Sequence, residues 1–256
     1  MVDEKETPKK YWHFLLDIFF KPRRVFAQLA EIQNYAWSIP MLLLTVMVVF
    51  ASLAGGPARF QNTVMNLAQP PDDFIYWTTE QQNQFHEGQM AMQGPLFTVV
   101  FPLLSSLVGL WLGWFLFSSI LHLLMTLKGS RQPREVYFNF VAWAAVPFAI
   151  RSLVQIIALL STKQIIDDQG LSGLISQEAA GWTAYLRLVL EMIDLYGIWF
   201  ILLLVLGSSM ISGLKPGKAI VTTLIACLIF IILALIPGII RLQLGGLSTA
   251  RPFIFF

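Results

Sequence analysis

Long apolar segments alternate along this chain with short polar ones, and the apolar segments show no two-residue alternation of polar side chains. Four stretches contain no Asp, Glu, Lys or Arg, and a fifth contains only Arg151; they cover residues 32–58, 88–127, 195–214, 219–240 and 136–162. Each is long enough to cross a bilayer, which takes about 20 mostly apolar residues. Because hydrocarbon offers no partner to a backbone amide or carbonyl, segments of this length must be helical.

The pattern therefore predicts an all-α integral membrane protein, a bundle of five transmembrane helices. We expect the spans over residues 38–54, 96–127, 136–160, 193–211 and 219–240. Residues 1–37 then form an N-terminal segment, and residues 241–256 a short tail. Between the first two spans, residues 55–95 form a polar loop with seven Gln from Gln61 to Gln93, in which Thr78 to Gln81 resembles a capping box that opens a helix. The purpose of this loop is left open by the sequence.

Charge predicts the orientation of the chain. Eleven of the 17 Lys and Arg residues lie before the first span, between the second and third, and between the fourth and fifth. The other connections carry the acidic residues Asp72, Asp73, Glu80, Glu87, Asp167, Asp168 and Glu178. Since cytoplasmic loops are the ones rich in Lys and Arg, we expect the N-terminus in the cytoplasm and the C-terminus outside.

An aromatic and aliphatic segment, Tyr11 to Phe20, precedes the first span and ends in a basic turn. Such a segment is typical of an amphipathic helix in the headgroup layer, with inserted rings and with cations against lipid phosphates. The alternative is a docking helix that packs on the inner loops. The expected interface anchors are Tyr11, Trp12, Phe14, Phe19, Phe20, Lys21, Arg23 and Arg24.

Ionisable residues inside spans are expensive, so each is a candidate functional residue. At about 1.5 Å per residue, Arg151 of the third span and Asp194 of the fourth lie at similar depth. We expect Arg151 to cluster with Asp194 and Glu191, with Arg187 completing the cluster near the outer surface. Because the charges balance, a structural link between the two helices is favoured over a substrate or proton site. Gly109 and Gly113 of the second span form a GxxxG motif, which predicts close helix packing.

The sequence gives little support to nucleic-acid binding, metal or cofactor binding, or catalysis. A net charge of +2 gives no reason to expect a nucleic-acid partner. The residues His13, His86, His122 and Cys227 have no metal-ligand spacing, so we expect no metal or cofactor. The sequence also lacks the phosphate-loop, dinucleotide-binding, nucleophile-elbow and zinc-protease motifs, and thus predicts no enzyme.

Three blocks of sequence resemble those of the Yip1-domain family, in the same order: Phe20 to Phe26 followed by Trp37; Lys128 to Arg131 followed by Phe140 to Pro147; and Trp199, Leu206-Gly207 and Ser212 to Ala219. The resemblance implies five membrane helices and no established catalysis. Eukaryotic members act with small GTPases in vesicle traffic and usually have a longer N-terminal region, whereas some prokaryotic members are associated with ABC-type exporters. A prokaryotic protein of the cytoplasmic (inner) membrane is therefore favoured.

The function expected from these features is that of a non-enzymatic accessory subunit or scaffold. It would bind membrane lipids and another integral membrane protein, possible partners including an ABC-type exporter. The alternative is a transport module that moves a lipid or small amphiphile through a cleft near Arg151 and Asp194. A polar-lined cavity would favour transport, and a closed bundle would favour the scaffold.

Overall fold

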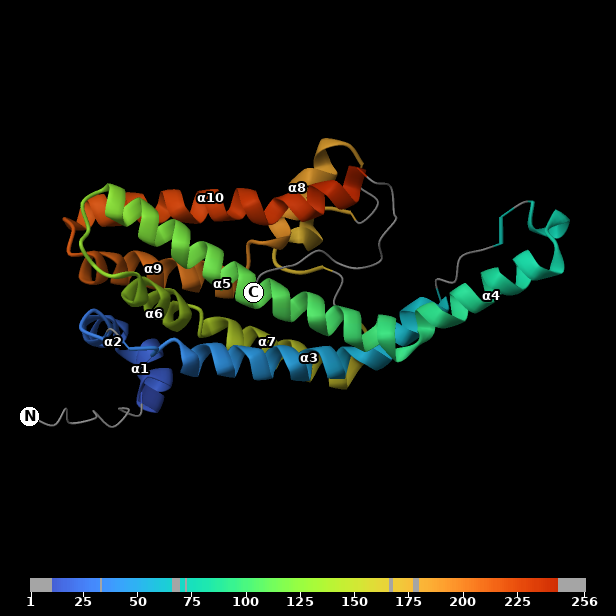
Figure 1. The fold of residues 1–256 in the computed structure, drawn as a ribbon, viewed down its shortest axis with the longest axis horizontal. Coiled ribbons are helices and arrows are strands. Elements are labelled where there is room, and N and C mark those ends of the chain that lie inside the picture. The colour runs from blue at the N-terminus through green and yellow to red at the C-terminus, as the bar shows by residue number, and fades with distance from the viewer. Residues whose placement is uncertain are drawn as a thin grey trace, which may run out of the picture.

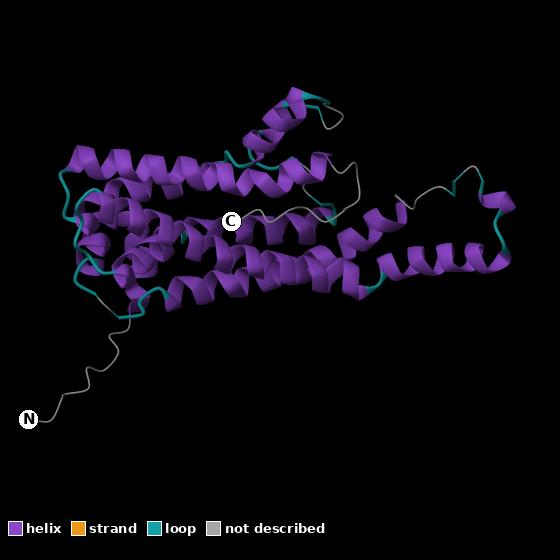
Figure 2. Cartoon of the chain, turned by 45° about the horizontal axis from the view of Figure 1, so that its top comes forward, coloured by secondary structure: helices purple, strands orange, loops and turns teal. Residues whose placement is uncertain are grey.

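A computed structural model of the chain describes residues 11–32, 34–65, 70–71, 73–165, 168–176 and 180–243. All regular structure in these ranges is helical, without a strand (Figure 2). Several residues of the predicted topology lie outside the described ranges, namely Lys5, Lys9, Lys10, Asp72, Asp167, Glu178 and residues 244–256 of the tail.

Five segments are long and apolar enough to cross a membrane, and they lie together in one bundle (Figure 1). The predicted all-helical, five-span fold is thereby confirmed. The segments are α3 (Ser38–Met65), the π-helical turn η3 with α5 (Leu96–Val100 and Phe101–Leu127), α6 with α7 (Arg134–Ala144 and Pro147–Thr162), α9 (Leu195–Ser212) and α10 (Pro216–Gln243).

The first span is longer than the sequence pattern predicts. Helix α3 continues to Met65, through residues assigned to the loop 55–95. Pro57 has no amide hydrogen to donate in this part of the helix. The Arg59 guanidinium joins the helix to η3, since its Nη1 donates to the carbonyls of Ser52 at 3.0 Å and Thr98 at 3.2 Å. Gly56 lets η3 approach, because a Cβ there would lie 2.7 Å from Val99.

The third span is two helices rather than one. Helix α6 ends at Ala144 and α7 begins at Pro147, which has no amide hydrogen to continue the backbone ladder. Every residue of α6 from Val136 to Ala144 is buried, so this helix lies at the centre of the bundle.

Two short helices, α1 (Phe14–Phe20) and α2 (Pro22–Leu29), follow the 3-10 turn η1 (Tyr11–His13) and pack onto the bundle. Phe14 and Ile18 of α1 are buried, and the rings of Phe14 and Trp143 meet edge to face at 5.4 Å. The opposite face of the segment exposes Trp12, Leu16 and Phe20. Of the expected interface anchors, Trp12, Phe20, Lys21, Arg23 and Arg24 are exposed, Tyr11 and Phe19 are half-buried, and Phe14 is buried.

A buried amide ties this N-terminal segment to the bundle. Asn139 of α6 is fully buried, and its Oδ1 accepts from the Trp37 amide at 2.8 Å. Its Nδ2 donates to the carbonyls of Ile32 at 3.3 Å and Asn34 at 2.8 Å. One side chain thereby bonds to three backbone groups of the turn between α2 and α3, of which the Asn34 carbonyl also accepts from the Ala36 amide at 2.8 Å.

The polar loop between the first two spans contains η2 (Phe74–Tyr76) and α4 (Thr79–Gln93). In both overall views α4 extends away from the bundle (Figures 1 and 2). The predicted capping box is present: Thr78 accepts from the Gln81 amide, and the Gln81 side chain accepts from the Thr78 amide. The remaining described elements are η4 (Ser172–Leu174) and α8 (Trp182–Glu191), which lie between α7 and α9.

Gly207 lies at a close contact between α9 and its neighbours. A Cβ at this position would lie 2.5 Å from a ring carbon of Phe140 and 2.6 Å from one of Phe26. These two rings pack edge to face at 5.0 Å, joining α2 to α6 directly over the glycine. The absence of a side chain at Gly207 therefore permits the junction of three helices.

We expect Gly207→Leu to lower the thermal unfolding temperature by about 5–10 °C, because overpacking a filled core costs about 1–3 kcal/mol. The measurement is thermal unfolding of the purified full chain in detergent. Gly217→Leu is the matched control, since a Cβ at Gly217 meets no atom within 4 Å. Equal unfolding temperatures for the two variants would contradict the close packing at Gly207.

Candidate functional site

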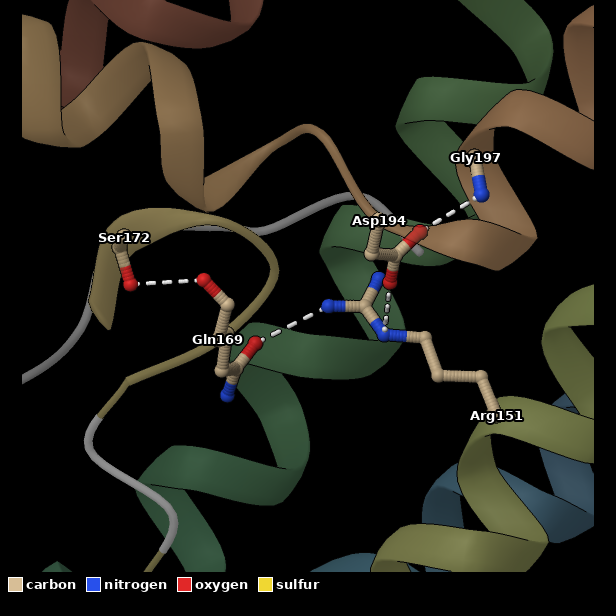
Figure 3. A network of polar contacts seen from close by, with 5 residues as sticks. All are labelled: Arg151, Gln169, Ser172, Asp194 and Gly197. Atoms are coloured by element: carbon tan, nitrogen blue, oxygen red, sulfur yellow. Dashed lines mark hydrogen bonds and ion pairs between the residues drawn. The ribbon is translucent and has the colours of Figure 1, made fainter. Parts of the chain in front are cut away.

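A charged network lies between the third and fourth spans, centred on Arg151 (Figure 3). The Arg151 side chain projects from the second turn of α7 and is about nine-tenths buried. Its Nε lies 3.1 Å from Oδ2 of Asp194, and its Nη2 donates to Oε1 of Gln169 at 3.0 Å. A buried cation is tolerated only with such partners, because its desolvation costs several kcal/mol.

Asp194 serves two partners at once. Its backbone is extended and it caps α9, with Oδ1 accepting from the Gly197 amide at 2.6 Å while Oδ2 faces Arg151. The positive end of the helix dipole also favours a carboxylate at this position. The 18 residues of α9 span about 27 Å, so the carboxylate lies near one end of the span.

Gln169 belongs to a loop that is hydrogen-bonded to the junction between α8 and α9. The Leu171 amide donates to the carbonyls of Leu190 at 3.0 Å and Ile193 at 3.1 Å, and the Ser172 hydroxyl donates to the Gln169 carbonyl at 2.6 Å. Gly170 has a φ of +58°, and a Cβ there would lie 2.6 Å from the Ile193 carbonyl oxygen. Only glycine fits this position, which holds Gln169 within reach of Arg151.

Of the four residues expected in the cluster, the structure brings Arg151 and Asp194 into direct contact. Arg187 instead pairs with Asp168, at 2.6 Å between Nη2 and Oδ1, in a partly exposed position. Glu191 is the last residue of α8. The difference arises because α8 is a separate helix that ends before Asp194, so that Arg187 does not continue the face of the fourth span.

Sequence reasoning missed Gln169 and the pairing of Asp168 with Arg187. Gln169 is uncharged and lies in a loop, so neither periodicity nor charge indicates it. The glycine at 170, next to a polar residue in a loop between two spans, was the only available signal.

The other sequence candidates lie apart from this network. Gly109 and Gly113 are both buried in α5. The rings of His122 and Tyr137 lie 5.2 Å apart inside the bundle, and Cys227 is buried in α10. Among the described residues, no group of three His, Cys, Asp or Glu is placed to hold a metal ion.

The geometry makes the network a clamp between helices. The Arg151 guanidinium contacts the Asp194 carboxylate and the Gln169 side-chain amide, and the Asp194 carboxylate also accepts from the first turn of α9. The clamp joins α7, the loop before η4 and α9, three segments that are separate in sequence. Its net charge is zero, as is appropriate for a site within a membrane.

We expect Arg151→Leu to destabilise the protein by about 3 kcal/mol, because Asp194 would remain buried without its cation. Asp194→Asn in the same chain should recover part of this loss, since Asn retains a good N-cap while removing the unpaired charge. Thermal unfolding of the single and double variants measures both effects.

Arg187→Gln is the control for this experiment, because partly exposed ion pairs contribute at most about 1 kcal/mol. A loss for Arg151→Leu no greater than that for Arg187→Gln would contradict the clamp.

Comparison with known proteins gives one match. The family model described as the Yip1 domain matches residues 16–236, which is most of the chain and includes all five spans in whole or in large part. No curated protein and no solved structure matches the chain. The matched region also contains α1, α2 and the Arg151–Asp194 clamp. This multi-pass membrane protein therefore belongs to the Yip1-domain family.

Proposed function

We propose that the protein is a non-enzymatic accessory subunit or scaffold that binds another integral membrane protein. The observation that carries this proposal is the arm formed by η2 and α4, which extends away from the bundle (Figure 1). A 15-residue helix with its own capping box, outside the bundle, presents surface that the spans do not cover. Loops of this length are usually either functional or disordered, and this one contains a capped helix.

The tip of the arm has a small core of its own. Phe74 packs against Trp77 at 5.4 Å and Phe85 at 5.3 Å, and Gln82 Nε2 donates to the Phe74 carbonyl at 3.1 Å. Beside this core, Ile75 and Tyr76 are 75% and 83% exposed. Large apolar side chains held outward on an ordered element are typical of contact sites for a protein partner.

The clamp supports a structural rather than a catalytic role for the charged residues. Arg151 and Asp194 direct their polar atoms at each other, at Gln169 and at the Gly197 amide. The family resemblance suggests an ABC-type exporter as the partner to test first.

The alternative function is transport of a lipid or small amphiphile beside Arg151 and Asp194. The buried charge within the bundle favours it, while the direct 3.1 Å contact between the two groups opposes it, because a passing substrate would have to separate them. Loss of lipid transfer in vesicles for Arg151→Leu, with the fold intact, would support this alternative over the scaffold.

We also propose that the N-terminal helices face the cytoplasm. The connections after α5 and α9 lie at the same end of the bundle as α1 and α2 (Figure 1), and the basic residues Lys21, Arg23, Arg24, Lys128, Arg131, Arg134, Lys215 and Lys218 lie on these segments. This end is called the basic end below. Positive residues are retained on the cytoplasmic side of a membrane.

For the scaffold, we expect a photo-crosslinking residue at position 75 to give one discrete product with a membrane protein in native membranes. Ile75 is exposed, so its replacement should not affect the fold. The control places the same residue at Leu174 of η4, which is 77% exposed but lies away from the arm. Products that are equal at both positions, or that contain only lipid, would contradict a partner site on the arm.

For the orientation, we expect a membrane-impermeant thiol reagent to label Gln84→Cys in intact cells, and Gly217→Cys only after permeabilisation. Both positions are exposed, and Cys227→Ala removes the native thiol, which is buried in α10. The reverse labelling pattern would invert the proposed topology.

A further inference from the structure

The two connections at the basic end border an open pocket, called the cavity below, that neither the clamp nor the arm accounts for. It has a volume of about 290 Å³ and is lined by Gly129, Arg131, Gln132, Ser212 and Gly213. This volume is at the lower limit for small-molecule sites, which suits a headgroup rather than a whole lipid. The cavity lies where α5 and α9 end, and therefore where the apolar spans give way to polar residues.

A hydrogen-bond network fixes the wall of the cavity. The Ser130 hydroxyl donates to the Ser212 carbonyl at 2.8 Å, and the Tyr137 hydroxyl donates to Ser130 Oγ at 2.7 Å. All three residues are buried. Lys218 Nζ donates to the Lys128 carbonyl at 2.8 Å, which ties the start of α10 to the other connection. The two loops are therefore held together without a ligand, and a bound group would meet a preformed surface.

The charge around the cavity selects the ligand. Residues 128–135 and 213–218 contain five basic residues and one acidic residue, Glu135. Arg134 stacks over the Phe138 ring at 4.5 Å, and in the part of the chain that the structure describes no carboxylate forms an ion pair with Lys128, Arg131, Lys215 or Lys218. Cations gathered at a membrane surface attract anionic lipids, and basic pockets between spans bind their headgroups. The start of α10 adds its positive dipole end at Pro216.

Exposed apolar side chains at the end of α5, in the turns before the lining residue Gly129, favour a lipid as the ligand. Leu123 and Leu127 lie on one face of the last turns of α5, and they are 59% and 71% exposed. They lie on the membrane side of the connection that carries Gly129 and Arg131. A lipid whose headgroup occupied the cavity would place its acyl chains alongside these leucines, whereas a soluble phosphate compound would not contact them.

We propose that this cavity at the basic end binds the phosphate headgroup of an anionic phospholipid, with Leu123 and Leu127 contacting the acyl chains. Arg131 of the lining supplies charge, and Lys215, two residues after the lining residue Gly213, adds to it. The site is separate from the arm and from the Arg151–Asp194 clamp, so it does not depend on the scaffold function.

The test is lipid binding to the purified full chain by native mass spectrometry, titrated with phosphatidylglycerol and with phosphatidylcholine. We expect phosphatidylglycerol to bind more tightly, and Arg131→Gln with Lys215→Gln to weaken its binding about tenfold or more. The matched control is Arg23→Gln with Arg24→Gln, which removes the same charge from the interface anchors of the N-terminal segment, and should weaken binding several times less than the first double variant does.

Three outcomes would overturn the proposal. Equal losses in both double variants would show attraction to the whole surface rather than a site. Equal binding of the two lipids would show that charge does not select the ligand. Displacement of phosphatidylglycerol by millimolar inorganic phosphate would assign the cavity to a soluble phosphate compound. Thermal unfolding of both variants shows that the fold is retained, which is expected because all four substituted side chains are exposed.

Discussion

The interior of this bundle must satisfy its own polar groups, because lipid hydrocarbon offers neither donors nor acceptors. Asn139 applies this constraint most directly, since its amide group serves three backbone groups of the turn before the first span. Two indoles do the same: Trp143 Nε1 donates to the Ala36 carbonyl and Trp114 Nε1 to the Phe138 carbonyl, both at 3.1 Å. Each of these bonds also fixes one helix against another segment. The interactions that satisfy these polar groups therefore also help to specify the fold of this protein.

The same constraint explains why the third span is broken and yet central. Pro147 separates α6 from α7, and each half then binds a different part of the chain. Helix α6 holds the N-terminal segment through Asn139, and α7 holds the loop before η4 and the start of α9 through Arg151. Through these contacts, one span links both ends of the bundle.

The sequence predicts what depends on composition and misses what depends on tertiary contact. Five charge-poor segments give the five spans, because burial in lipid imposes one helix on each. Depth along the spans places Arg151 beside Asp194, since an unpaired buried charge is so costly. The extension of α3 past Pro57 was not predictable, because proline often ends a helix and the contact of Arg59 with the Thr98 carbonyl, 39 residues away, leaves no signal in the sequence. Gln169 and Asn139 were missed for the same reason: a neutral amide carries no periodic or charge signal, and its partners are 18 and more than 100 residues away.

The N-terminal segment has two faces, which explains why the sequence alone left two interpretations open. Phe14 and Ile18, four residues apart, are buried against the bundle, and Trp12, Leu16 and Phe20, also at four-residue spacing, are exposed. A soluble docking helix needs only the first set, and a helix lying free in the headgroup layer needs only the second. A segment that carries both sets is suited to both interpretations, with one face against the bundle and the other free for lipid. Because the turn after α2 is held by Asn139, the exposed rings keep a fixed height relative to the spans, and so do the cations of Arg23 and Arg24. The N-terminal segment is therefore held in one position against the spans.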